Sequence, residues 1–178
     1  MSANELLLDS ARSGDLAGIV KALADGANPE VEDGRHKRET ALMYVAAGGR
    51  LDCMAVLLDA KATPDHRNRW GVAALHLAAE SGDVAGTALL ISHGASPSIQ
   101  SRWGRTALHM AAAKGHAETC RLLVAAGADL RIEDQRGRSP LDVCRSDQLR
   151  GLLVSEAERL ALECGLATPT GKSATHRI

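Results

Sequence analysis

Apolar and polar positions along this chain follow a pattern that returns every 33 residues. Each unit contains two short segments whose apolar residues are spaced i, i+3 and i+4, the spacing of a helix that buries one face. In one unit the first segment would bury Leu42 and Val45, and the second would bury Met54 and Leu57. The pattern therefore predicts pairs of short helices, stacked so that neighbouring units share one continuous core.

The register of the units also holds at positions of different chemistry. Three columns keep leucine, glycine or alanine in successive units: Leu42, Leu75, Leu108 and Leu141; Gly49, Gly82 and Gly115; Ala62, Ala95 and Ala128. The run Thr106-Ala-Leu-His109 and the later pair Gly127-Ala128 resemble the signature of the ankyrin repeat family, over about residues 4 to 155. This resemblance implies an all-α solenoid of helix-turn-helix repeats joined by β-hairpin or finger loops.

The same resemblance divides the chain into an array and a tail. We expect the ankyrin repeat array over residues 1–164, with a disordered tail over 165–178. The expected repeats and closing cap are 4–36, 37–69, 70–102, 103–135 and the capping repeat 136–164. In the cap we expect a first helix at 139–144 and a longer one at 149–164, with all four residues of the leucine column buried in a row.

Two residues depart from what a regular repeat would favour. Lys61 stands where the family usually has a glycine in the left-handed conformation, which should strain its repeat by about 1 kcal/mol. Gly86 lies inside a predicted helix and should weaken it by about 1 kcal/mol relative to alanine, unless close packing requires glycine.

Composition narrows the classes of partner and the cellular compartment. The net charge of the 178-residue chain is −1, which argues against a general attraction to nucleic acid or to membranes. The first residues show neither a basic leader nor a long apolar run. The basic residues of 35–38 are interpreted as part of a solvated loop rather than as a nuclear-import signal. Four cysteines lack zinc-site spacing and are interpreted as reduced core residues: Cys53, Cys120, Cys144 and Cys164. We expect a cytoplasmic or nuclear protein that binds no membrane.

No motif in the sequence indicates a catalytic or cofactor site. His76 and His109 share a column near the start of the first helix of their units, where the resemblance implies that the imidazole bonds to the backbone of a neighbouring repeat. Residues 170–173 match only the end of a phosphate-binding loop, because Leu166 stands where the first glycine is required. We therefore predict no enzymatic activity, no cofactor and no metal site.

Aromatic and basic residues gather in the predicted finger loops. Trp70 and Trp103 are the two tryptophans of the chain, occupy one column and each follow an arginine. Tryptophan and arginine are the residue types most enriched among interface hot spots. The resemblance also implies that partners bind the fingers and the inner face of the first helices, which gives this candidate partner-binding set: Arg67, Arg69, Trp70, Glu80, Ser81, Arg102, Trp103, Arg105, Lys114, Arg136 and Arg138.

The function predicted from these residues is that of a non-catalytic protein–protein interaction module. We expect one or more protein partners, with an acidic segment that would meet the arginines. Nucleic-acid binding through the Arg and Trp finger tips is the alternative, and the interleaved Asp129 and Glu133 disfavour it. A structural alternative for the tryptophans is that each packs along the neighbouring finger with an arginine stacked on its ring.

Overall fold

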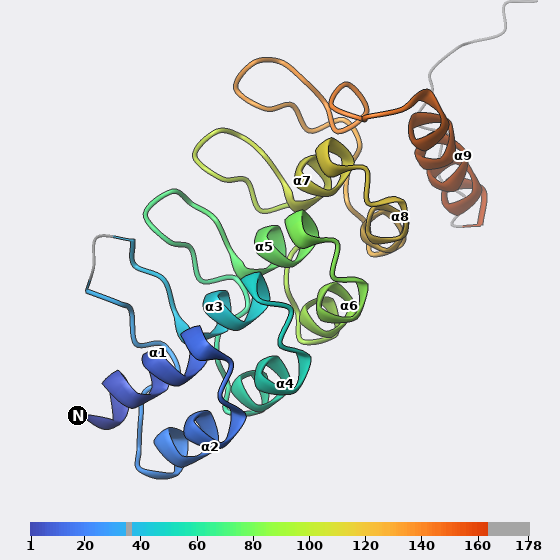
Figure 1. Cartoon of the computed structure of the whole chain (residues 1–178). Coiled ribbons are helices and arrows are strands. Elements are labelled where there is room, and N and C mark those ends of the chain that lie inside the picture. The colour runs from blue at the N-terminus through green and yellow to red at the C-terminus, as the bar shows by residue number, and fades with distance from the viewer. Residues whose placement is uncertain (35–36, 164–178) are drawn as a thin grey trace, which may run out of the picture.

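The computed structural model describes residues 1–34 and 37–163, so the predicted tail at 165–178 lies outside the described residues. The helices of these two ranges are α1 (Ala3–Ser13), α2 (Leu16–Ala24), α3 (Ala41–Ala47), α4 (Leu51–Asp59), α5 (Ala74–Ser81), α6 (Val84–Ser92), α7 (Ala107–Lys114), α8 (Ala117–Ala125) and α9 (Asp147–Glu163). They form two rows (Figure 1), with α1, α3, α5 and α7 beneath the projecting loops and α2, α4, α6 and α8 on the outer side.

Each helix packs on its equivalents in the neighbouring repeats as well as on its own partner. Contacts join α1, α3, α5 and α7 along the inner row and α2, α4, α6 and α8 along the outer row, and α9 closes the stack against α8. Leu42, Leu75 and Leu108 are buried as predicted, and so are small residues between the helices such as Ala78 and Ala111. The stacked helix pairs predicted from the 33-residue period are confirmed.

The closing cap differs from the prediction in two respects. Residues 140–143 form turns, so the helix expected at 139–144 is absent from this described segment. Ser139 donates from its backbone N–H and from its hydroxyl to Oδ2 of Asp142 (2.9 and 2.6 Å), which closes one turn that does not continue. Leu141 is only partly buried because no further inner helix covers it. The prediction that it would be buried like the other three leucines is wrong.

Lys61 adopts the left-handed conformation that the sequence predicted for its position. Its φ angle is 69°, in the region that normally favours glycine. The backbone N–H groups of Lys61 and Ala62 donate to the C=O groups of Leu58 (2.9 Å) and Leu57 (3.0 Å) and so close the end of α4. These hydrogen bonds offset part of the strain at Lys61.

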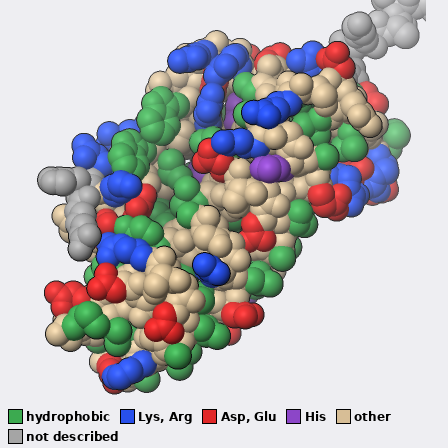
Figure 2. All heavy atoms as spheres, viewed as in Figure 1, with side chains coloured by type: hydrophobic (Ala, Val, Ile, Leu, Met, Phe, Trp, Pro, Cys, Tyr) green, Lys and Arg blue, Asp and Glu red, His purple; other side chains and the backbone are tan. Residues whose placement is uncertain are grey.

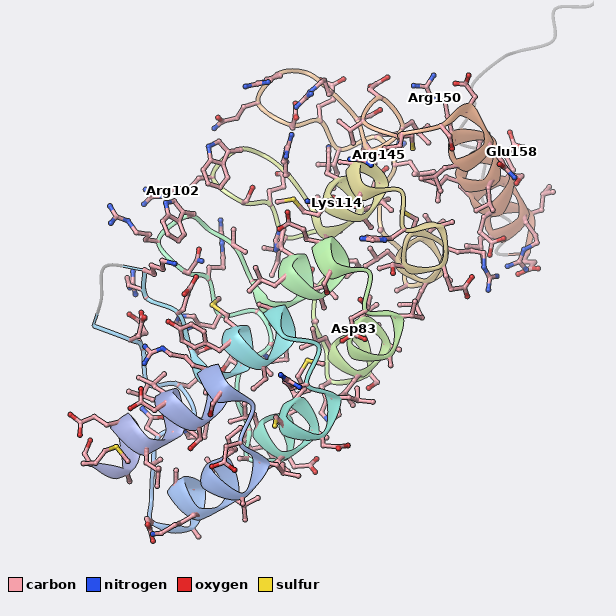
Figure 3. All side chains as sticks on the ribbon, viewed as in Figure 1. Asp83, Arg102, Lys114, Arg145, Arg150 and Glu158 are labelled. Atoms are coloured by element: carbon pink, nitrogen blue, oxygen red, sulfur yellow. The ribbon has the colours of Figure 1, made fainter. Side chains whose placement is uncertain are left out.

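Gly86 is buried in α6, beside the residue that caps this helix. Its backbone N–H donates to Oδ1 of Asp83 (2.9 Å), and Figure 3 shows Asp83 at the start of α6. A Cβ atom at Gly86 would lie 2.2 Å from Oδ2 of Asp83 and 2.5 Å from Cε of Met54 in α4. An alanine at this position would have to displace the Asp83 carboxylate that caps α6 and the buried methyl group of Met54.

Replacing Gly86 by alanine should destabilise the protein by about 1 to 3 kcal/mol, because the overpacking outweighs the better helix propensity of alanine. Gly151 in α9 offers a matched control, since no atom lies within 4 Å of its Cβ position. Gly151→Ala should stabilise the protein by about 0.5 to 1 kcal/mol. Chemical denaturation measures both changes, and a stabilising Gly86→Ala substitution would contradict the packing argument.

Candidate functional site

Four loops project from the inner row of helices, and we number them fingers 1 to 4 in chain order (Figure 1). Finger 1 is described at residues 32–34 and 37–39, finger 2 comprises 67–72, finger 3 comprises 100–105 and finger 4 comprises 133–138. Fingers 2 to 4 are each closed by a backbone hydrogen bond of hairpin type, from residue 68 to 72, 101 to 105 and 134 to 138.

A buried polar side chain also closes each of these three fingers from the inside. In finger 4, Oδ1 of Asp134 accepts from the backbone N–H groups of Arg136 (2.9 Å) and Arg138 (3.1 Å). Asn68 and Ser101 hold the equivalent positions in fingers 2 and 3 and accept from the backbone of their own loops. Because all three side chains are buried, the shape of each finger is maintained from within.

Neighbouring fingers are joined near their tips by single backbone hydrogen bonds. Each bond runs from an N–H group to a C=O group of the preceding finger: Arg69 to Lys37 (3.0 Å), Arg102 to Trp70 (2.8 Å) and Gln135 to Trp103 (2.9 Å). Gly104 permits this approach, since its φ is 75° and a Cβ atom there would lie 3.0 Å from Cα of Asp134. The fingers therefore form one connected surface.

His76 and His109 connect the inner helices to the following finger. Nδ1 of His109 accepts from the backbone N–H of Thr106 (3.2 Å), so Nε2 carries the proton and donates to the C=O of Arg138 in finger 4 (3.0 Å). His76 makes the equivalent contacts one repeat earlier. Burial lowers the pKa of both imidazoles, which keeps them neutral. The predicted bond to the backbone of a neighbouring repeat is confirmed.

The two tryptophans differ in their surroundings. The Trp103 residue is 50% exposed, whereas Trp70 is partly buried. Nζ of Lys37 and the guanidinium carbon of Arg69 each lie 6.0 Å from the centroid of the Trp70 ring, at the outer limit of a cation–π contact. The packing alternative therefore describes Trp70, and Trp103 is the tryptophan that presents its indole to solvent.

Trp103 borders a groove of about 600 Å³ between fingers 3 and 4. Met110 of α7 and Glu80 of α5 line it from the side of the inner helices. The complete lining consists of Glu80, Trp103, Arg105, Met110, Asp134, Gln135, Arg136 and Arg138. The groove thus combines five of the predicted binding residues with an apolar side chain. Figure 2 shows Lys and Arg side chains gathered over the fingers in the upper part of the view.

Four other predicted residues lie outside the lining of this groove. Nζ of Lys114 lies 3.3 Å from Oε1 of Glu80, which extends the charged surface along the inner helices. Figure 3 shows Arg102 projecting from the tip of finger 3. A second hollow, of about 590 Å³, has Arg102 and Arg69 in its lining. Ser81 is exposed, and its hydroxyl donates to a backbone C=O of its own helix.

Arg67 and Trp70 have structural contacts that the sequence did not reveal. The guanidinium of Arg67 donates to the C=O of Gln100 (2.9 Å) and so joins finger 2 to finger 3. Trp70 contributes its own C=O to the backbone bond with the next finger. Neither residue lines the groove beside Trp103.

Asp134 is the electrostatic centre of the groove. Its Oδ2 accepts from Nη2 and Nε of Arg138 (2.8 and 3.1 Å) and lies 3.7 Å from Nε of Arg105. These guanidinium hydrogen bonds, together with those from two backbone N–H groups, hold the pKa of Asp134 well below its usual range although burial acts in the opposite direction. Arg105 and Arg138 therefore face a compensating charge within the protein.

The stability of the chain should fall on acidification, and Asp134 should account for part of that fall. Because the folded state binds this proton less readily than the unfolded chain does, its stabilising contribution is complete above the ordinary carboxyl pKa of about 4 and declines as the pH drops below it. Asp134→Asn should flatten the pH dependence of the unfolding midpoint between about pH 4 and 2. The exposed Glu133→Gln on the same finger is the control, and an equal flattening there would contradict the assignment.

Three groove residues were absent from the predicted set. Met110 belongs to a column with Tyr44 and Leu77, all partly buried on the inner helices, and this apolar column was a usable signal. Gln135 follows Arg69 and Arg102 in the finger-tip column, where the change from arginine to glutamine hid its position in the groove. The role of Asp134 depends on side-chain contacts that the repeat pattern alone does not specify.

A second polar cluster lies at the N-terminal end of the inner face. Nη2 of Arg12 lies 3.2 Å from Oδ2 of Asp33, and the Tyr44 hydroxyl donates to the same oxygen. The guanidinium also stacks on the Tyr44 ring at 4.8 Å. Burial, reinforced by the hydrogen bond to Asp33, raises the pKa of Tyr44 to about 12. These groups satisfy one another, and the cluster anchors finger 1 to α1 and α3.

The two-row helical stack with a finger-lined groove defines a solenoid repeat protein. A family model described as ankyrin repeats (3 copies) matches residues 7–101 and 85–158, most of the chain. The chain therefore belongs to the ankyrin repeat family, whose members typically act in protein–protein interactions and usually lack catalytic activity. No curated protein matches the chain in a comparison of sequences.

Two further properties bear on the candidate functions. Within residues 1–34 and 37–163, no helix has the length and apolar character needed to cross a membrane. In the same part of the chain, no three His, Cys, Asp or Glu side chains are grouped so that they could hold a metal ion. Cys53 and Cys120 are buried free thiols and Cys144 is a half-buried one, while Cys164 lies outside the described residues.

Proposed function

We propose that this chain is a non-catalytic interaction module that binds a partner protein through its fingers and the inner row of helices, with the groove beside Trp103 as the central contact. The observation that carries the proposal is the half-exposed indole of Trp103 on a surface whose fingers are bonded to one another. A preorganised surface loses little conformational entropy on binding. An aromatic anchor of this kind contributes strongly to the free energy of binding when a partner removes it from water.

The charges around the groove favour a partner segment with carboxylates. Arg105 and Arg138 already face Asp134. In contrast, Arg102 and Arg136 form no ion pair within the described ranges 1–34 and 37–163, which leaves their guanidinium groups for an external anion. A partner could place a large apolar side chain between Trp103 and Met110 and a carboxylate on Arg136, with bidentate geometry strengthening the pair.

Nucleic-acid binding is less well supported by the same residues. A nucleobase could stack on Trp103, but Glu80, Glu133 and Asp134 place carboxylates in or next to the groove. These groups would repel a phosphate backbone, while a peptide can avoid them because it carries separate charges. The three cysteines within the described residues are free thiols, which fits the cytoplasm or the nucleus.

A peptide display library rich in Asp, Glu and large apolar residues tests this function. Selected peptides should combine a large apolar residue with a nearby carboxylate, and Arg136→Glu should weaken their binding about tenfold or more. Arg131→Glu is the control, because Arg131 is exposed, pairs with Asp129 (3.0 Å) and does not line the groove. Selection of basic peptides, equal effects of the two substitutions, or tight binding of single-stranded oligonucleotides would contradict the proposal.

A further inference from the structure

The outer faces of α2, α4 and α6 carry apolar side chains that are open to solvent in this chain. Leu16, Val20 and Leu51 are 38%, 49% and 41% exposed. The α6 helix has no charged residue anywhere along its length, and a helix that is apolar all round is normally buried. Figure 2 shows hydrophobic side chains along the edge of the molecule formed by α2, α4 and α6. This edge has the composition of a surface that packs against another element.

A groove of about 510 Å³ runs between α4 and α6 on this outer side. Its lining is mostly small and apolar: Leu51, Asp52, Ala55, Ala85, Ala88, Leu89 and Ser92. The alanines would let a third helix approach at the usual interaxial distance of about 8 to 10 Å. An amphipathic helix is the element that fits a shallow apolar channel between two helices.

The two walls of this outer groove differ in charge. Asp52 and Asp59 are exposed and lie seven residues apart on α4, so they stand on one side of the helix about 10 Å from each other along its axis. In α6 the equivalent positions are Ala85 and Ser92, which are uncharged. Oδ1 of Asp59 lies 3.9 Å from Nε2 of His93 at the exposed end of α6. Asp52 therefore lines the groove on the α4 side, with Asp59 on the same helix beyond the lining, whereas the α6 residues of the lining are uncharged.

The outer face changes character in the following repeat. Glu118 and Arg121 of α8 stand at the positions that Ala85 and Ala88 occupy in α6. Arg121 in turn bonds to Glu118 (2.9 Å), so this part of the outer row has a solvated, charged surface. The apolar groove is thus a specific property of the repeats around α4 and α6, and the stacking of the array does not require it.

We propose that the outer groove between α4 and α6 binds an amphipathic helix of a partner protein, with basic residues spaced seven apart along the border that meets Asp52 and Asp59. A second copy of this chain fits the groove less well. Its outer helices α2, α4 and α6 would have to supply the basic residues that meet Asp52 and Asp59. Lys21 is the one Lys or Arg in these three helices, and it already pairs with Asp25 (2.6 Å). The outer groove lies on the opposite row of helices from the Trp103 groove, so the chain can hold two partners at once.

Selection from a display library of helical peptides of about 15 residues tests this inference. The apolar face of the peptides varies among Ala, Val, Leu and Met, and each polar border varies among Lys, Gln and Glu. Ala88→Arg serves for counter-selection, because it introduces the residue found at the equivalent position of α8 and leaves the buried core untouched. Enriched peptides should carry Lys along one border only, at a spacing of seven residues, and bind Ala88→Arg about tenfold or more weakly.

Two further variants separate the charge from the shape of the groove. Asp52→Asn combined with Asp59→Asn should reduce the preference for Lys over Gln peptides about fivefold. Trp103→Ala should bind the selected helices as the native chain does, since Trp103 lies on the other face. Equal binding by the native and Ala88→Arg chains, no enrichment of Lys, or a native dimer that Ala88→Arg dissociates in sedimentation would each overturn the proposal.

Discussion

Leu108→Ala should lower the free energy of unfolding by about 2 to 5 kcal/mol. Leu108 is fully buried in α7, and α7 packs on both α5 and α8. Alanine would leave a cavity that these helices cannot fill without losing contacts of their own, because the alanines around it already bring the backbones close together. The cost therefore includes both the lost apolar burial and the residual cavity.

The effect of Leu108→Ala should be concentrated in the repeats that adjoin it. Hydrogen exchange should show lost protection in α5 to α8 first, while α1 and α2 keep theirs, since stability in a repeat array comes mainly from contacts between neighbours. Leu141→Ala is the matched control, and it should cost less because Leu141 is only partly buried. An equal loss of protection along the whole chain would contradict a modular array.

Trp103→Ala should weaken binding of a selected acidic peptide by about 2 kcal/mol or more, which is roughly thirtyfold in affinity. The half-exposed indole of Trp103 borders the groove, and a partner that covers it gains both apolar burial and a dry surrounding for the nearby arginines. The fold should remain nearly as stable, because the residue lies on a loop and outside the core.

Trp70→Ala should show the opposite balance. Its ring is partly buried, lies near Lys37 and Arg69 and does not line the groove, so its loss should reduce stability more and peptide binding less than Trp103→Ala. Fluorescence anisotropy with a labelled peptide measures the affinities, and thermal unfolding measures the stabilities. If Trp70→Ala proved the more damaging substitution for binding, the interface would have to lie nearer finger 2.

The repeat pattern made the helical stack predictable because each apolar column has one structural meaning. Leu42, Leu75 and Leu108 recur at one register and are buried for the same reason, contact with the next repeat on each side. The bond from His109 to the backbone of the neighbouring repeat was expected from the family resemblance, because the histidine position recurs in the repeat. Pattern reasoning failed where a repeat has no following neighbour, as at Leu141 in the cap.

The sequence predicted which residue types and which loops form the candidate site better than it predicted the individual residues. Trp70 and Trp103 look identical in the sequence, yet Lys37 and Arg69 lie near the Trp70 ring and no such contact appears for Trp103 among the described residues. That difference depends in part on Lys37, a side chain of the preceding finger, and such side chains vary between repeats. Met110 was missed because an apolar residue on the inner helices can belong equally to the core or to a groove.

The central claim, that the groove beside Trp103 receives the partner, has a direct spectroscopic test. The chain has two tryptophans, so Trp70→Phe leaves Trp103 as the one reporter indole. Titration of this variant with the selected acidic peptide should shift the tryptophan emission to shorter wavelength, with the same midpoint as binding measured by anisotropy, because the partner removes the indole from water. Binding that leaves the emission of Trp103 unchanged would contradict the claim.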